Sequence, residues 1–136
     1  MRVFLDTNVL VSAFATRGLC SDLLRSILAE HELVTGEVVL GELRRALQHR
    51  IKLPPITISG IDQFLKKQIV VPKPSKPYPI EITDPDDKWI LATAVAGNAD
   101  VLVTGDSDLL EVAAKSPIRI MTPREFWDLV RGGSST

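Results

Sequence analysis

The sequence is poor in the residues that build disulfides, zinc sites and membrane spans. Cys20 is the only cysteine among 136 residues, which excludes an intrachain disulfide and a cysteine-rich zinc site. No apolar run reaches about 18 residues, so we expect no transmembrane helix. The apolar stretch near Met1 meets an acid at Asp6, too early for a signal-peptide core. These absences predict a cytoplasmic protein without disulfides and without a membrane partner.

Several catalytic patterns are also missing. Neither standard glycine-rich phosphate loop occurs, and no nucleophile elbow or Ser-His-Asp order is evident. The two histidines, His31 and His49, form no ligand pair by spacing. P-loop chemistry, acyl transfer and a histidine-based metal site are therefore disfavoured.

The composition that remains is that of a globular protein. Hydrophobic residues make up 45% of the chain and charged residues 24%, which argues against a wholly disordered chain. We expect one domain over residues 1–131, large enough to bury a core without a structural metal. Residues 132–136 are predicted to form a disordered tail.

The charges balance to a net of −1 but are unevenly distributed. Basic side chains dominate residues 42–52 and 66–76, whereas residues 81–87 carry acids and no base. This separation fits a basic surface beside an acidic site, and it also fits solvated helix faces and a loop.

Short apolar runs alternate with helical periodicities along the chain. The predicted strands cover Arg2–Leu5, 32–34, Ile69–Val71, Val101–Val103 and 118–120. Helices are expected over 9–14, around 23–28, from a cap at Thr35 until the helix fades before Pro54-Pro55, over 58–68, from Asp84 to Ala96, and from a capping box at Thr122 and Glu125. This alternation predicts an α/β layer with a mainly parallel sheet.

Residues 72–79 hold four prolines, which bar a helix or a central strand there. We expect an extended surface loop, either a connector or a binding segment.

Two predicted strands end close to an acid. Arg2–Leu5 runs into Asp6, and Val101–Val103 leads through Thr104 to Asp106. In open α/β sheets, ligands bind beyond the carboxyl ends of the strands, at the switch in strand order. We therefore expect both carboxylates to face one crevice, with two further acids joining them from helices: Glu42 and Asp87.

Each of these acids also has a purely structural interpretation. Asp6 and Asp106 suit helix N-caps, and Asp87 suits the first turn of a helix, where the macrodipole favours a carboxylate. Glu42 has the spacing for an ion pair with Arg45. As a set, however, four carboxylates in one crevice would repel one another, and Mg²⁺ or Mn²⁺ would relieve that repulsion. Such an ion activates water and neutralises charge on a phosphodiester.

In four places the sequence resembles the PIN domain family, most closely its toxin-type, VapC-like branch. The matching segments follow one another over roughly residues 1–130: Val3–Leu10 with its Asp-Thr-Asn, Val39–Leu43 with the helical glutamate, Asp84–Ala94, and Ala99–Leu110. The resemblance implies a three-layer α/β/α sandwich with a mainly parallel central sheet, and a metal-dependent ribonuclease. It implies Mg²⁺ or Mn²⁺ as cofactor, a homodimer and a small antitoxin partner.

By the same resemblance, Asp6, Glu42, Asp87 and Asp106 form the acidic site, with Asn8 and Thr104 as supporting residues. Asp108 shares or replaces the role of Asp106. The leading hypothesis is an endoribonuclease in which Asp6, Asp87 and Asp106 hold the metal, while Glu42 orients water at the metal or transfers a proton. Five basic residues are candidates for phosphate contacts with RNA: Arg44, Arg45, Arg50, Lys66 and Lys67.

Two other functions stay open. A phosphatase of the haloacid-dehalogenase type would use Asp6 as nucleophile, but it needs a second aspartate where this chain has Asn8. A non-catalytic module that binds RNA or protein would not require four acids.

Overall fold

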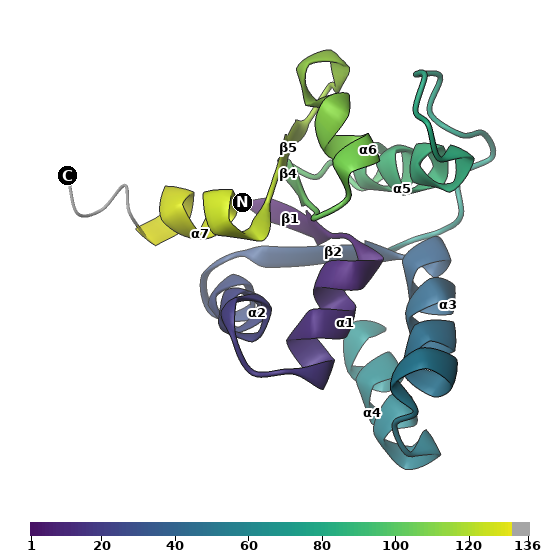
Figure 1. The fold of residues 1–136 in the computed structure, drawn as a ribbon, viewed down its shortest axis with the longest axis vertical. Helices are drawn as coiled ribbons and strands as arrows, with labels where there is room; N and C mark the ends of the chain where they lie inside the picture. Colours follow the sequence, from purple (N-terminus) through teal and green to yellow (C-terminus); the bar gives the residue numbers. More distant parts are fainter. Residues whose placement is uncertain (132–136) are drawn as a thin grey trace.

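A parallel five-stranded sheet forms the centre of the structure, a computed structural model that describes residues 1–131 (Figure 1). The strands lie in the order β3-β2-β1-β4-β5 and are all parallel. Their bounds are β1 (Arg2–Leu5), β2 (Glu32–Gly36), β3 (Ile69–Val71), β4 (Val101–Val103) and β5 (Arg119–Met121). The predicted mainly parallel sheet is confirmed.

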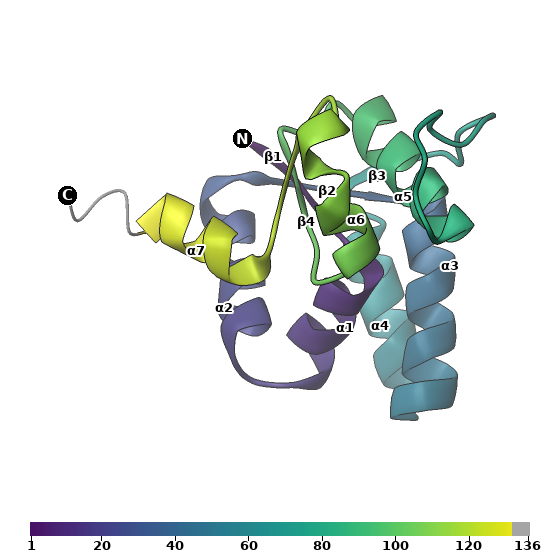
Figure 2. The same cartoon turned by 45° about the horizontal axis from the view of Figure 1, so that its top comes forward.

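Helices cover both faces of this sheet, which makes the predicted three-layer α/β/α sandwich (Figures 1 and 2). One face carries α1 (Thr7–Ala15), α2 (Leu19–Glu30), α3 (Glu37–Arg45) and α4 (Pro55–Leu65), and the other carries α5 (Pro85–Ala96) and α6 (Ser107–Glu111). The last helix, α7 (Pro123–Arg131), packs beside α2. None of the helices in residues 1–131 is long and apolar enough to cross a membrane.

The order of the strands creates a switch point between β1 and β4. The chain leaves β1 toward β2 and β3, then returns to the other side of β1 to form β4 and β5. Leu5 pairs with Val103, and the Asp6 N–H donates to the Val103 carbonyl oxygen at 3.0 Å. The acids that follow these two strands therefore begin from the same edge of the sheet.

The central strands are buried on both faces, as their continuous apolar sequences predict. Val3, Phe4 and Leu5 in β1 and Leu102 and Val103 in β4 have no exposed surface. This packing makes the edge that carries the acids a rigid platform.

At three places the local structure differs from the helices predicted from the sequence. Thr35 does not cap α3, because β2 continues to Gly36 and pairs Thr35 with Val70, which leaves the Thr35 side chain buried. The helix predicted over 58–68 instead spans Pro55–Leu65, since Pro55 occupies its first turn. Beyond α3 the chain continues in π-helical turns over Ala46–Ile51. The tail predicted at 132–136 lies outside the described residues.

Other local predictions are confirmed. Asp84 caps α5 by accepting from the Asp86 N–H, and Pro85 takes the first position of that helix. Thr122 and Glu125 form the capping box of α7, each side chain bonding the backbone N–H of the other. Residues 72–79 form neither helix nor strand.

Gly36, at the end of β2, offers a test of the packing that holds α3 and α5 on opposite faces of the sheet. A methyl group at this position would overlap the side-chain methyl of buried Thr93 on α5. We expect Gly36→Ala to lower the free energy of unfolding by about 2 kcal/mol, measured by urea denaturation. Adding Thr93→Ser, which removes the clashing methyl, should recover part of the loss. Additive effects in the double variant would contradict this interpretation.

Candidate metal centre

A cavity of about 310 Å³ opens at the switch point between β1 and β4, and acids dominate its wall. The four carboxylates singled out in the sequence line it, although they come from four different segments of the chain: Asp6, Glu42, Asp87 and Asp106. Asp84 and Asp86 also line it, together with Thr7, Asn8, Arg45 and Arg50. The structure thus brings these carboxylates into one cavity.

Asp6 is held in place by two hydrogen bonds. Its Oδ1 accepts from the Thr7 N–H at 2.8 Å, and its Oδ2 accepts from the Thr104 hydroxyl at 2.7 Å. Asp6 therefore caps α1, and that structural role coexists with a place in the cavity. Burial raises the pKa of Asp6 above its ordinary value, against the two hydrogen bonds that lower it, and nearby Asp106 raises it further.

Thr104 couples Asp6 to Asp106 across the two strand ends. Its hydroxyl donates to Asp6 and accepts from the Asp106 N–H at 2.9 Å. Asp106 in turn caps α6, since its Oδ1 accepts from the Asp108 N–H at 2.8 Å. A single buried hydroxyl thus sets the spacing of two acids that are far apart in the sequence.

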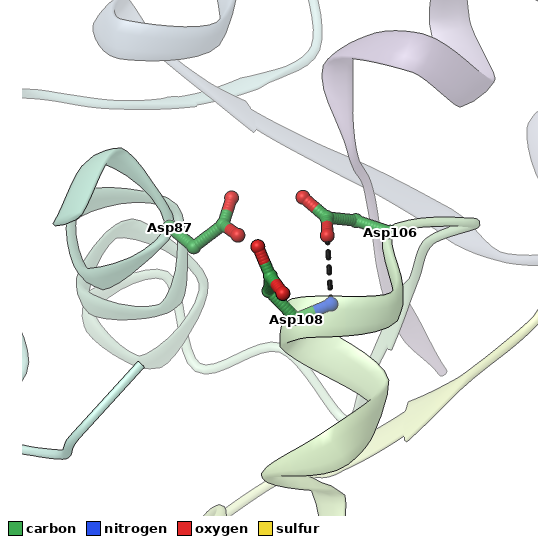
Figure 3. Close-up of side chains that lie close together, drawn as sticks. All are labelled: Asp87, Asp106 and Asp108. Atoms are coloured by element: carbon green, nitrogen blue, oxygen red, sulfur yellow. Dashed lines mark hydrogen bonds between the residues drawn. The ribbon is translucent and has the colours of Figure 1, made fainter. Parts of the chain in front are cut away.

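Asp87 lies in the first turn of α5 and is only 6% exposed. Its Oδ2 is buried and makes no hydrogen bond, so capping of its helix does not account for this side chain. Burial, the close approach of the Asp106 carboxyl and the charges of Asp106, Asp84 and Asp6 raise the pKa of Asp87 to about 8. Figure 3 shows the side chains of Asp87, Asp106 and Asp108 close together. One carboxylate oxygen from each lies within 4.8 Å of the other two.

Glu42 enters the cavity from α3. Its Oε1 accepts from the Thr7 hydroxyl at 2.9 Å, and Arg45 acts on it as a nearby positive charge. Burial raises the pKa of Glu42, the Thr7 hydrogen bond lowers it, and Asp6 and Asp86 raise it. Thr7, which positions Glu42, is not among the site residues predicted from the sequence, although its place directly after Asp6 was an available signal.

This donor set fits a hard divalent cation. All candidate ligands are carboxylate oxygens, which Mg²⁺ and Mn²⁺ prefer. The Oδ2 of Asp87 is buried without a partner, and burial together with neighbouring carboxylates raises the pKa of Asp6 and of Asp87, so a cation among them would favour their ionised forms. The tight cluster contains Asp108 beside Asp87 and Asp106, whereas Asp6 lines the same cavity outside that cluster.

The basic residues proposed to contact phosphate divide into two groups. Arg45 and Arg50 line the cavity, and Arg50 donates to the Asn8 side-chain oxygen at 3.3 Å. Arg44 and Lys66 instead form ion pairs with Asp62, each at 2.8 Å. Lys67 lines a separate cavity with Leu28, His31 and Gln68. The structure therefore brings two of the five to the acidic cavity.

Fold and site together define an α/β protein with an acidic centre at the topological switch point. The profile of the PIN domain family matches residues 2–108, and the chain belongs to that family. Among solved structures, VapBC2 from Rickettsia felis, bound to a DNA fragment from its promoter, superposes with a TM-score of 0.64 and 21% identity, covering 90% of this chain and 98% of that one.

Two further structures share the fold at similar identity. VapBC-1 from nontypeable Haemophilus influenzae has a TM-score of 0.62 and 16% identity, covering 91% of this chain and 99% of that one. FitAcB from Neisseria gonorrhoeae has a TM-score of 0.57 and 20% identity, covering 89% and 97%. No curated protein sequence matches the chain significantly. At these identities the likeness concerns the fold.

Proposed function

We propose that the protein is a metal-dependent endoribonuclease. The observation that carries this proposal is the convergence of four carboxylates on one cavity, with the buried Oδ2 of Asp87 unpartnered. Membership of the PIN domain family supports it. Asp6, Asp87 and Asp106 would hold Mg²⁺ or Mn²⁺, with Asp108 close enough to contribute. When bound, the ion lowers the pKa of water and neutralises charge on the phosphodiester.

The other residues of the cavity have distinct roles in this proposal. Thr104 keeps Asp6 and Asp106 in register, and Thr7 orients Glu42. Glu42, whose pKa is raised, accepts a proton from the attacking water. Water attacks phosphorus in line, the bond from phosphorus to the 3′ oxygen breaks, and that oxygen takes a proton from solvent, so the products carry a 3′-hydroxyl and a 5′-phosphate. Arg45 and Arg50 contact the RNA backbone from the same wall.

We further propose that the protein acts as the toxin of a toxin–antitoxin pair, as a homodimer blocked by a small antitoxin. The fold it shares with VapBC2, VapBC-1 and FitAcB supports this finer role. Ile56 on α4 is 84% exposed, and Phe64 on the same helix is also exposed, so this helix offers apolar surface to a second copy or a partner.

Removal and return of the metal tests the proposed reaction. With structured RNA, we expect cleavage in Mn²⁺, loss of at least about a hundredfold in rate in excess EDTA, and recovery when Mn²⁺ is restored. The products should be degraded by a 5′-phosphate-dependent exonuclease. Undiminished cleavage in EDTA would contradict the metal requirement, and RNA binding without cleavage in Mn²⁺ would support the non-catalytic module. The phosphatase alternative would be supported by a trapped aspartyl-phosphate at Asp6. The neutral Asn8, two residues later, stands where that type of enzyme needs a second aspartate.

A further inference from the structure

A second cavity, of about 450 Å³, adjoins the acidic centre. Glu42, Arg45 and Asp86 line both cavities, so the two are neighbours along one surface. Its volume falls within the range of small-ligand pockets, about 300–1,000 Å³. None of the proposed steps of RNA cleavage uses the remaining wall of this cavity, which includes Trp89 and Lys73.

Trp89 provides an aromatic face in this wall. It lies on α5 two residues after Asp87 and is half-buried. The ammonium group of Lys73 lies over the ring, 4.8 Å from its centroid. The Lys73 side chain is exposed, so it can leave the ring face. Because stacking of a base on an aromatic ring outweighs an exposed cation–π contact, a base can replace the ammonium there.

The proline-rich segment, residues 72–79, is anchored at two points to α3 and α5, and its Lys73 lies over the Trp89 ring. At one end the Lys73 N–H donates to Glu37 Oε1 on α3 at 2.8 Å, and toward the other the Tyr78 N–H donates to the Lys88 carbonyl oxygen on α5 at 3.0 Å. Its prolines restrict the backbone between these anchors. Lys73, the residue of this segment that lines the cavity, is therefore carried by a restrained stretch of backbone.

The charges of the wall favour a base over a phosphate. Glu37, Glu42 and Asp86 contribute three carboxylates, against two cations from Arg45 and Lys73. These carboxylates repel a phosphate, but they accept hydrogen bonds from the amino groups that bases present on their edges. An aromatic face surrounded by acceptors thus matches a nucleobase.

We propose that this second cavity binds one unpaired RNA base, stacked on Trp89, in a nucleotide next to the phosphate that is cleaved. The inference rests on the proposed ribonuclease function and names the form of its substrate, because a base inside a duplex cannot leave its stack to enter the cavity without unpairing. Lys73, displaced from the ring, contacts the backbone phosphate of that nucleotide.

A substitution of the protein combined with a deletion from the substrate tests this subsite. The substrate is a single-stranded oligoribonucleotide with one cleavage site, alone or with an abasic nucleotide at each neighbouring position. We expect Trp89→Ala to lower kcat/KM about tenfold and Trp89→Phe to retain most of it. An abasic nucleotide at one of these positions should lower kcat/KM of the wild type by the same factor. It should not lower kcat/KM of Trp89→Ala any further. If instead every abasic substrate lowers kcat/KM of Trp89→Ala as much as it lowers kcat/KM of the wild type, the proposed subsite is wrong.

Fluorescence separates failure of the subsite from failure of the proposed function. The chain has two tryptophans, and Trp127→Phe leaves Trp89 as the only one. With Ca²⁺ in place of Mn²⁺ to slow cleavage, single-stranded RNA should quench this emission several-fold more than duplex RNA does. Quenching in a protein that never cleaves RNA would support the subsite and reject the nuclease. Cleavage by the Trp127→Phe protein with equal quenching by both RNAs would reject the subsite alone.

Discussion

Replacing Asp6 by asparagine is expected to slow RNA cleavage roughly a thousandfold, equivalent to about 4 kcal/mol of lost transition-state stabilisation. The substitution removes one negative charge from the acidic cavity at its most rigid position, between the Thr7 N–H and the Thr104 hydroxyl. The asparagine oxygen can still accept from Thr7, so the cap of α1 survives and the fold is maintained. Single-turnover cleavage of structured RNA in saturating Mn²⁺ measures the effect.

Asp128→Asn is the matched control for this prediction. It removes the same charge from an exposed position on α7, outside the residues that line the acidic cavity. We expect the control to cleave at the wild-type rate. Equal cleavage by the wild type and Asp6→Asn, with both variants folded by circular dichroism, would remove the assignment of Asp6.

Replacing Asp87 by asparagine is expected to stabilise the metal-free protein and to abolish its stabilisation by Mn²⁺. Burial is the main cause that raises the pKa of Asp87 to about 8, and the neighbouring Asp106 and Asp84 add to it. At pH 7 the Asp87 carboxyl of the metal-free protein must take up a proton when the chain folds, and asparagine, which is neutral in both states, removes that cost. We expect the free energy of unfolding to rise by about 1–2 kcal/mol, measured by urea denaturation in EDTA.

The pH dependence follows from the same shift. A carboxyl whose pKa is higher in the folded state than in the unfolded chain binds more protons when folded, so stability falls as pH rises between the two values. For Asp87 this interval runs from its ordinary value of 3.8 to about 8. Wild-type protein in EDTA should therefore lose stability from pH 5 to pH 8, and Asp87→Asn should lose less. A wild-type stability that rises across this interval would contradict the assignment.

In Mn²⁺ the wild type should be more stable than Asp87→Asn, the reverse of their order in EDTA. An ion present at about 100 times its dissociation constant stabilises the folded protein by about 2.7 kcal/mol, and Asp87→Asn should lose most of that gain because a ligand is missing. Asp22→Asn is the control, since it removes an acid from the first turn of α2, away from the cavity. It should lower stability by a few tenths of a kcal/mol through the helix dipole, with or without Mn²⁺.

The acids that the sequence singled out, and that the structure brings to one cavity, are tied to local structural signals. Asp6 directly follows one apolar strand, Asp106 comes three residues after the end of another, and Asp84-Pro85 marks the start of a helix that carries Asp87 in its first turn. These signals are short in range, since caps and prolines act within one turn. They were enough to place the acids at the ends of elements, and parallel strands bring such ends to one edge.

Only two of the five basic residues predicted to contact RNA line the acidic cavity, because charge runs do not indicate where long side chains point. Arg44 and Arg45 are neighbours in sequence, yet Arg45 lines the cavity while Arg44 turns to Asp62 on α4. The Asp62 partner lies 18 residues away in sequence and joins Arg44 only through the packing of two helices. Such pairings depend on tertiary contacts that periodicity does not encode.

By itself, the sequence determined the alternation of strands and helices, the caps and the family, since these depend on local residue patterns. Tertiary structure decided that the Thr104 hydroxyl joins Asp6 to Asp106 and that Thr7 holds Glu42. It also decided that Lys73, from the proline-rich segment, lies over the ring of Trp89. The reason is that strand order and helix packing bring together residues whose separation in the chain carries no signal of their contact.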